Sequence, residues 1–188
     1  MKSQEIIPLY DQFHMKMEVG KYYKDVNNYQ NQFDGTWIYT SGTTSLTFKI
    51  RKITKHHISD QYHNYFMDIL VGEYQYIENG VQKSNSLNNF DQTFADYYMY
   101  NLSSSHLLLI TRSIPPVCTD CSELEKRLFF AFFENQITDE YQDSATVGAR
   151  VVTENNQVKL KINFGKRFSW GPGHGFSIPY GNYTLIKQ

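Results

Sequence analysis

The sequence predicts an all-β domain, because apolar residues alternate with polar ones along short segments that turn residues separate. In residues 45–53, Leu46, Phe48 and Ile50 alternate with polar side chains, and the same period of two recurs in residues 158–164. Tyrosine and phenylalanine occur 15 and 13 times, and both residue types favour strands over helices. About eight to ten strands at this spacing indicate a barrel or a sandwich.

The first predicted hairpin starts at Gly35, where the missing Cβ allows a tight approach before a run of large side chains. Trp37 lies on one face of this first strand, and Ser41-Gly42 is a turn signal. Residues 45–53 return as the second strand. The polar, histidine-rich residues 54–64 that follow predict a loop or an irregular edge.

Residues 65–77 predict a long strand in which the apolar pattern changes phase. The apolar residues before Gly72 lie on one parity, whereas Tyr74 and Tyr76 lie on the other. A bulge at Gly72 would return both sets to one face, and bulges are common where barrel strands bend. The Asn79-Gly80 pair then predicts a tight hairpin, because both turn positions need positive φ.

The rest of the chain predicts short strands joined by polar connections. Residues 128–133 are apolar on both parities, so we expect both faces of this strand to be covered, for example by the N-terminal segment 1–32. No repeat or boundary divides the chain, which predicts one domain over residues 1–188 with 1–32 covering one end. The further predicted strands are 81–87, 107–112, 147–152, 158–164 and 183–187, and 147–152 and 158–164 form a predicted hairpin around Asn155-Asn156.

Charge and hydropathy argue against two classes of partner. The net charge of -1 gives no electrostatic basis for binding nucleic acid or an anionic membrane. The longest apolar runs, 107–110 and 128–133, are too short to cross a bilayer. We therefore expect no nucleic-acid partner and no transmembrane segment, and the sequence indicates no particular protein partner.

Cys118 and Cys121 are the only cysteines, in the order Cys-Thr-Asp-Cys. A redox motif would need a βαβ setting, and a structural zinc site would need a second ligand pair. A local loop disulfide in an exported protein is one interpretation, and two free thiols in a cytosolic protein are the other. The sequence predicts neither a metal nor a cofactor here.

A cluster of potential metal ligands lies in the predicted loop 54–64. His56, His57, Asp60 and His63 have a spacing that would suit one helical face, but the segment lacks helical periodicity and a helix cap. We interpret it as a solvated loop and predict no metal site. No nucleophile elbow or paired carboxylate is recognisable either, so the sequence predicts a protein that is not an enzyme, with no catalytic residues.

The glycine-rich residues 171–175 follow the last long hairpin. They are not a phosphate loop, because no Lys-Ser or Lys-Thr follows and no helix offers its N-terminus. With Phe168, Trp170 and Phe176 around them, they could form a flap at a barrel mouth, or pack as an ordinary surface loop.

The residues Gly35-Thr36-Trp37 resemble the Gly-x-Trp signature of lipocalins and related calycin barrels. The resemblance implies a single antiparallel barrel whose lower end is closed by Trp37. It also implies that a basic residue from a late strand packs over this indole. Arg167 is the candidate for that residue, and Arg150 is the alternative.

A second resemblance covers more of the chain. Residues 22–29, 33–40, 71–80 and 183–188 are similar to an uncharacterised family of exported proteins from flavobacteria and other Bacteroidetes. That family has no established activity, so the resemblance implies family membership but no particular function. Residues 90–145 match it less clearly.

The N-terminus has no apolar signal core, which by itself would indicate a cytoplasmic protein. Members of the exported family begin their mature part near a Gln-x-Ile-Ile-Pro sequence, which matches Gln4 to Pro8 here. The resemblance therefore implies an exported protein of the periplasm, cell envelope or medium, with its signal peptide absent from this chain and Met1 to Ser3 as an expression remnant.

These observations support a hypothesis and an alternative. The first is a lipocalin-like barrel that binds a small hydrophobic ligand in its interior. The alternative is a non-enzymatic protein of the cell envelope that interacts through exposed aromatic residues in 88–105 and 165–181. The predicted ligand-binding residues are Trp37, Phe48, Tyr74, Tyr76, Leu160, Ile162 and Trp170.

Overall fold

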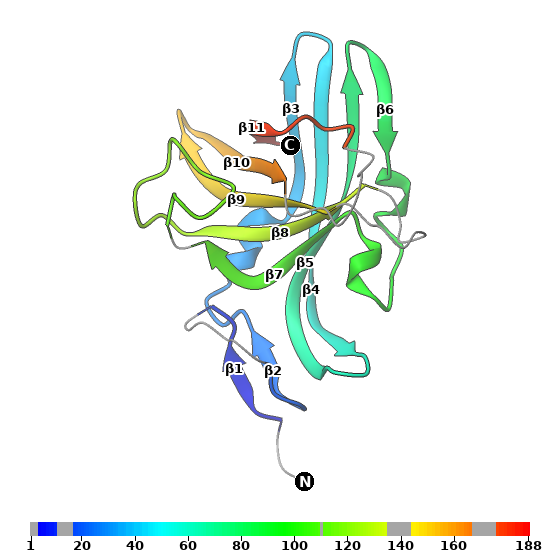
Figure 1. Cartoon of the computed structure of the whole chain (residues 1–188), viewed down its shortest axis with the longest axis vertical. Coiled ribbons are helices and arrows are strands. Elements are labelled where there is room, and N and C mark those ends of the chain that lie inside the picture. The colour runs from blue at the N-terminus through cyan, green and yellow to red at the C-terminus, as the bar shows by residue number, and fades with distance from the viewer. Residues whose placement is uncertain (1–3, 11–16, 110, 135–143, 167–175) are drawn as a thin grey trace.

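Eight antiparallel strands close into a barrel in this computed structural model, which describes residues 4–10, 17–109, 111–134, 144–166 and 176–188 (Figure 1). Each barrel strand pairs with the next one along the chain, and the last strand pairs with the first. The all-β prediction is therefore confirmed. The barrel strands are β3 (Gly35–Ser41), β4 (Thr44–Ser59), β5 (Asn64–Glu78), β7 (Leu102–Leu109), β8 (Arg127–Phe133), β9 (Ser144–Glu154), β10 (Gln157–Lys166) and β11 (Gly181–Lys187).

Three further strands extend the sheet beside β5. The first two, β1 (Ile6–Pro8) and β2 (Tyr22–Lys24), run parallel to each other, and β2 runs parallel to β5. β6 (Val81–Asn85) pairs antiparallel with the other end of β5. One edge of β5 therefore carries β2, β7 and β6 in succession, and β4 and β5 project beyond the barrel at their turn (Figure 1).

The phase change in β5 does not mark a bulge at Gly72, so that prediction is wrong. The β4–β5 register is unbroken from Ser45↔Ile77 to Ile53↔Ile69, with Gly72 opposite Ile50. Both faces of β5 are buried instead, because one faces the barrel interior and the other faces a second hydrophobic cluster outside it. Glycine is needed for another reason, since a Cβ at Gly72 would lie 2.6 Å from the Lys49 carbonyl oxygen.

The second cluster packs between the outer face of β5, the N-terminal strands and the connection before β7. It contains the odd-numbered apolar residues of β5 that precede Gly72 and lie on the opposite face from Tyr74 and Tyr76. Since β5 must bury two faces, its apolar residues occupy both parities. The buried members are Leu9, Tyr23, Ile58, Tyr65, Met67, Ile69, Val71 and Tyr100.

Residues 54–64, predicted as a loop or an irregular edge, form an irregular hairpin rather than a loop. β4 continues to Ser59 and β5 begins at Asn64, so most of this segment forms a long hairpin. The ladder shifts register between Ile53 and His56, where Lys55 has φ 56°. The two predicted asparagine turns are confirmed, with positive φ at Asn79 and Gly80 and again at Asn155 and Asn156.

A short 3-10 helix, η1 (Tyr29–Phe33), packs against the barrel core through its last residue. Its last residue, Phe33, is fully buried and packs edge-on against Phe130 at 6.2 Å between ring centroids. The Phe33 carbonyl oxygen accepts a 2.8 Å hydrogen bond from Trp37 Nε1. The helix η1 is therefore tied to the core indole.

Two shorter 3-10 helices, η2 (Leu87–Asn89) and η3 (Tyr97–Met99), lie in the connection from β6 to β7. None of the helices in the described ranges is both long and apolar enough to cross a membrane.

Candidate functional site

The predicted ligand-binding residues inside the barrel form its hydrophobic core. Each is at most 3% exposed, and all belong to one cluster with aromatic residues from β8 and β10. Tyr74 packs edge-on against Phe132 at 4.9 Å, and Phe132 does the same with Phe164 at 5.2 Å. These core residues are Trp37, Phe48, Tyr74, Tyr76, Leu160 and Ile162. Trp170 lies outside the described residues.

The basic residue over Trp37 is Lys187 of β11. Its Nζ lies 5.2 Å from the centroid of the indole, and the two residues are register partners. Arg150 cannot take this role, because it points out of the barrel and pairs with Asp120 and Glu125. Arg167 lies outside the described residues.

A pocket of about 610 Å³ lies on the outer wall of the barrel, where β5 and β7 part. The two strands pair only at Val71↔Ser103 and Gly72↔Leu102. Beyond that point β5 continues into the projecting hairpin, and the Ser104 hydroxyl accepts a 2.9 Å hydrogen bond from the Leu70 amide. The pocket therefore lies where β5 and β7 separate.

Three parts of the chain line this outer pocket. The floor comes from the outer faces of β7 and β8, one wall from the projecting β4–β5 hairpin, and the other wall from η3 and the two residues before it. The lining residues are His56, Ile58, Ser59, Asp60, His63, Tyr65, Met67, Ala95, Asp96, Tyr97, Tyr98, Ser103, Ser104, Phe129, Ala131 and Phe133.

Two buried polar atoms of the lining have no partner within the described part of the chain. One is Nε2 of His56 and the other is Oγ of Ser103, a residue only 2% exposed. Burying a polar group without a hydrogen bond costs about 1–3 kcal/mol in proteins. Both residues line the outer pocket, so a ligand or water placed there could satisfy them.

Burial lowers the pKa of His56, and a hydrogen bond to the Ala95 main chain acts in the opposite direction. The imidazole is therefore neutral at pH 7. A neutral imidazole has one nitrogen that accepts, so Nε2, the buried nitrogen without a partner, can serve as a hydrogen-bond acceptor.

The rim of the outer pocket carries two carboxylates. Asp60 accepts from the Tyr62 and His63 amides at 2.7 and 2.8 Å, and its Oδ2 lies 2.8 Å from His63 Nδ1. The hydrogen bond from His63 is the main cause that lowers the pKa of Asp60. Asp96 caps η3 by accepting from the Tyr98 amide at 2.9 Å.

The histidine cluster does not converge on a single point. His57 stacks on Phe66 at 4.5 Å and bonds Asn64, whereas His56 packs edge-on against Tyr97 at 6.0 Å. His63 turns to Asp60. Among the residues that the structure describes, only Cys118, Asp120 and Cys121 bring three potential metal-ligand atoms close together.

Cys118 and Cys121 are joined in a disulfide, so their sulfurs are not thiolate ligands. The disulfide lies in the loop that covers the outer face of β9 and β10. Asp120 ties this loop to the barrel, because it pairs with Arg150 at 2.8 Å and with Lys161 at 3.2 Å.

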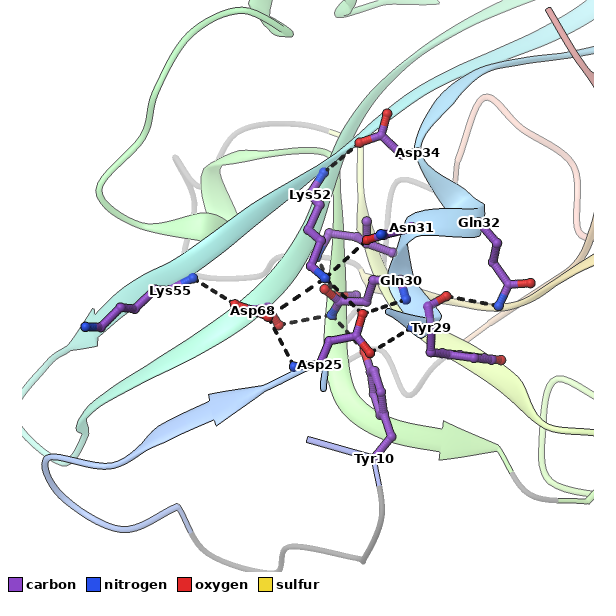
Figure 2. Close-up of polar contacts among 12 residues, drawn as sticks. Tyr10, Asp25, Tyr29, Gln30, Asn31, Gln32, Asp34, Lys52, Lys55 and Asp68 are labelled. Carbon is purple, nitrogen blue, oxygen red and sulfur yellow. Dashed lines mark hydrogen bonds and ion pairs between the residues drawn. The ribbon is translucent and has the colours of Figure 1, made fainter. Parts of the chain in front are cut away.

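A second polar cluster, around Asp25 and Asp68, anchors the N-terminal segment (Figure 2). Both aspartates are at most 2% exposed, and Lys52 Nζ lies 2.9 Å from Asp25 and 3.8 Å from Asp68. Every carboxylate oxygen of the two aspartates accepts a hydrogen bond. The donors include the Tyr22 hydroxyl and the main-chain amides of residues 25, 29, 30 and 55. Because these oxygens are satisfied internally, the cluster stabilises the fold rather than offering a site.

The aromatic residues of 88–105 turn partly inward. Phe94 packs edge-on against Tyr100 at 4.8 Å, and the Arg51 guanidinium lies over the rings of Phe90 and Tyr100. Tyr98 is 42% exposed and lines the outer pocket. The glycine-rich residues 171–175 and the proposed flap residue Phe168 lie outside the described residues.

The interior face of β8 is buried, as predicted, whereas its outer face is only partly covered. Its interior face packs in the barrel core, and its outer face forms the floor of the outer pocket. Tyr98 of η3 meets Phe133 of β8 at 6.0 Å. The covering segment on this side is therefore the connection before β7, and no sequence signal linked that connection to β8.

The closed meander of eight strands, with Trp37 over η1 and beneath Lys187, defines a lipocalin-like barrel of the calycin type. The chain belongs to the family of unknown function DUF6705, whose model matches residues 1–188. The predicted membership of an uncharacterised family is thus confirmed. Comparison with curated proteins and with solved structures gave no match.

Proposed function

We propose that this protein is a non-enzymatic binding protein that holds a small molecule in the outer pocket between β5 and β7. The observation that carries the proposal is the pocket itself, about 610 Å³ with the unpartnered His56 Nε2 and Ser103 Oγ in its lining. Ligand sites typically have a volume of roughly 300–1,000 Å³, mostly apolar walls and a few polar groups. The outer pocket has a volume in this range and combines aromatic walls with polar groups.

This location differs from the barrel interior of the first hypothesis. The described interior residues pack on one another, and the rings of Tyr74 and Phe132 lie 4.9 Å apart between their centroids. A ligand between them would have to displace this packing, whereas the outer pocket is already open. The polar atoms without partners also favour the outer pocket.

An exported location is part of the proposal. The Cys118–Cys121 disulfide supports it, because disulfides persist in oxidising compartments and are rare in reducing ones. The histidines support a role without catalysis, since His56, His57 and His63 each face a different partner.

Native mass spectrometry of the protein purified from its own host tests the proposal. We expect a co-purifying small molecule that organic extraction removes. Ala131→Trp, which fills the floor of the outer pocket, should abolish it. The control Thr184→Trp places the same side chain on the exposed outer face of β11, and should retain it. A bare mass for the wild-type protein, or a ligand retained by Ala131→Trp, would contradict the proposal.

A further inference from the structure

The lining of the outer pocket contains carboxylates but no lysine or arginine among the residues described. Its ionisable groups are two carboxylates, Asp60 and Asp96, two imidazoles, His56 and His63, and the phenols of three tyrosines. The nearest basic residue along the hairpin, Lys55, lies over the rings of Tyr22 and Phe66 on the opposite face. The pocket therefore presents a negative potential at neutral pH.

Aromatic rings supply most of the apolar wall. The ring centroids of Tyr97 and Tyr98 are 4.1 Å apart. The ring of Tyr98 is perpendicular to that of Phe133, with 6.0 Å between their centroids. Burial raises the pKa of Tyr65 to about 12 and raises that of Tyr97 further, so both phenols are uncharged at neutral pH. The faces of such rings attract cations, and aromatic cages recognise substituted ammonium groups in this way.

The unpartnered polar atoms match the same chemistry. The neutral imidazole of His56 can accept a hydrogen bond at Nε2, and the Ser103 hydroxyl can accept one at Oγ. An ammonium group has N–H donors for both acceptors. An anion would instead meet two carboxylates and an imidazole lone pair, with no basic side chain to compensate.

We propose that the outer pocket selects a small organic cation: an amine that carries an aromatic or aliphatic body. This inference rests on the proposed function and adds the chemical class of the ligand. The amine contacts the acceptors of His56 and Ser103 and the tyrosine faces of η3, while Asp60 and Asp96 attract it at the rim. The body of the ligand packs on Phe129, Ala131 and Phe133 of the floor.

Three indoles that share a two-carbon side chain and end in groups of different charge test this class. Tryptamine is cationic at pH 7.5, tryptophol is neutral and indole-3-acetate is anionic. Calorimetric titration of the full chain should give tryptamine about a tenfold lower Kd than tryptophol, with indole-3-acetate the weakest. Raising the salt concentration should reduce the preference, because rim charges are screened.

Two variants locate the preference in the outer pocket. Asp96→Asn keeps an oxygen to cap the Tyr98 amide but removes the charge, so the preference for tryptamine should fall several-fold. Asp60→Asn, in the turn at the opposite wall, repeats the test independently of η3. The matched control Asp91→Asn changes an exposed aspartate outside the lining, and should leave all three Kd values unchanged.

The inference is overturned if the three indoles bind within twofold of one another, if indole-3-acetate binds most tightly, or if none binds. If the three indoles bind equally and Ala131→Trp abolishes their binding, the outer pocket is still a ligand site but is not selective for cations. The native mass spectrum of the host protein decides the proposed function separately.

Discussion

Lys187 reaches over Gly35 to place its ammonium group 5.2 Å from the centroid of the Trp37 ring. Gly35 has φ +129°, and a Cβ there would lie 3.0 Å from Lys187 Cε. The glycine thus provides both a backbone conformation and the space that the lysine stem needs. This relationship gives a physical reason for a Gly-x-Trp sequence at the start of a closed barrel.

Gly35→Ala should lower the free energy of unfolding by about 1–3 kcal/mol, because it combines an unfavourable φ with a tight contact. Urea unfolding followed by tryptophan fluorescence measures the loss. In a Lys187→Ala background the contact is removed and only the backbone strain is left, so the same substitution should cost less. Equal stability of Gly35→Ala and wild type would contradict this account.

Arg127 is a fully buried cation that organises the loop after β7. Its guanidinium donates to the carbonyl oxygens of Thr111, Ile114 and Pro116 and to Asn163 Oδ1. Arg127→Met should cost about 2–4 kcal/mol of stability, because several buried acceptors lose their donor. Chemical denaturation measures this cost.

Lys159→Met is the matched control for Arg127→Met. Lys159 pairs with Glu154 at 3.2 Å on the outer surface, so its loss should change stability by about 1 kcal/mol or less. A similar cost for the two variants would show that burial of Arg127 is not what matters.

Reduction of the Cys118–Cys121 disulfide should lower stability by about 2 kcal/mol or less, because it closes only a short loop. Thermal unfolding with and without a reducing agent measures the difference. The variant with both cysteines replaced by serine should be insensitive to the reagent. Protein from its own host should lack two hydrogens relative to the reduced mass, and a fully reduced mass would argue against an exported location.

Glu73 predicts a pH dependence of stability. Its side chain is 1% exposed on the outer face of β5, and burial raises the pKa of its carboxyl to about 7. The Ser86 hydroxyl and the Asn101 amide approach the carboxyl and act to lower this pKa, yet neither makes a hydrogen bond of normal geometry. Lys49, its register partner, extends over Phe90 instead.

Because the pKa of Glu73 in the folded state is above its ordinary value of 4.5, the native state favours the protonated form. Its contribution to stability is therefore complete below pH 4.5 and is lost as the pH rises to about 7. Glu73→Gln should remove this slope and be more stable than wild type by about 2–3 kcal/mol above neutral pH.

Urea unfolding of wild type and Glu73→Gln at acidic and mildly alkaline pH measures the effect. Glu123→Gln, which changes an exposed glutamate, serves as the control and should leave the slope intact. A wild-type slope that persists in Glu73→Gln would assign the pH dependence to another group.

The barrel could be predicted because local signals agree with its global fold. The alternation in β4 and β10 and the asparagine turns each depend on neighbouring residues only. The burial of Trp37 followed in the same way. The identity of Lys187 as its partner did not, because it depends on the register between the first and last strands of the barrel.

The outer pocket could not be predicted, because it arises where two strands part rather than from a local pattern. Ser103 and His56 lie far apart in the chain and meet only through the limited pairing of β5 with β7. The alternating phases of β5 were the available signal. They indicated two buried faces, and the bulge at Gly72 was the wrong explanation for them.

Methyl resonances during a ligand titration test the central claim most directly, since they separate the outer pocket from the barrel interior. We would titrate the protein with tryptamine and follow Met67 and Ala131 in the outer pocket, and Ala149 and Leu160 in the core. The account predicts saturable shifts at Met67 and Ala131, with Ala149 and Leu160 unchanged. Shifts confined to Ala149 and Leu160 would place the ligand inside the barrel and contradict it.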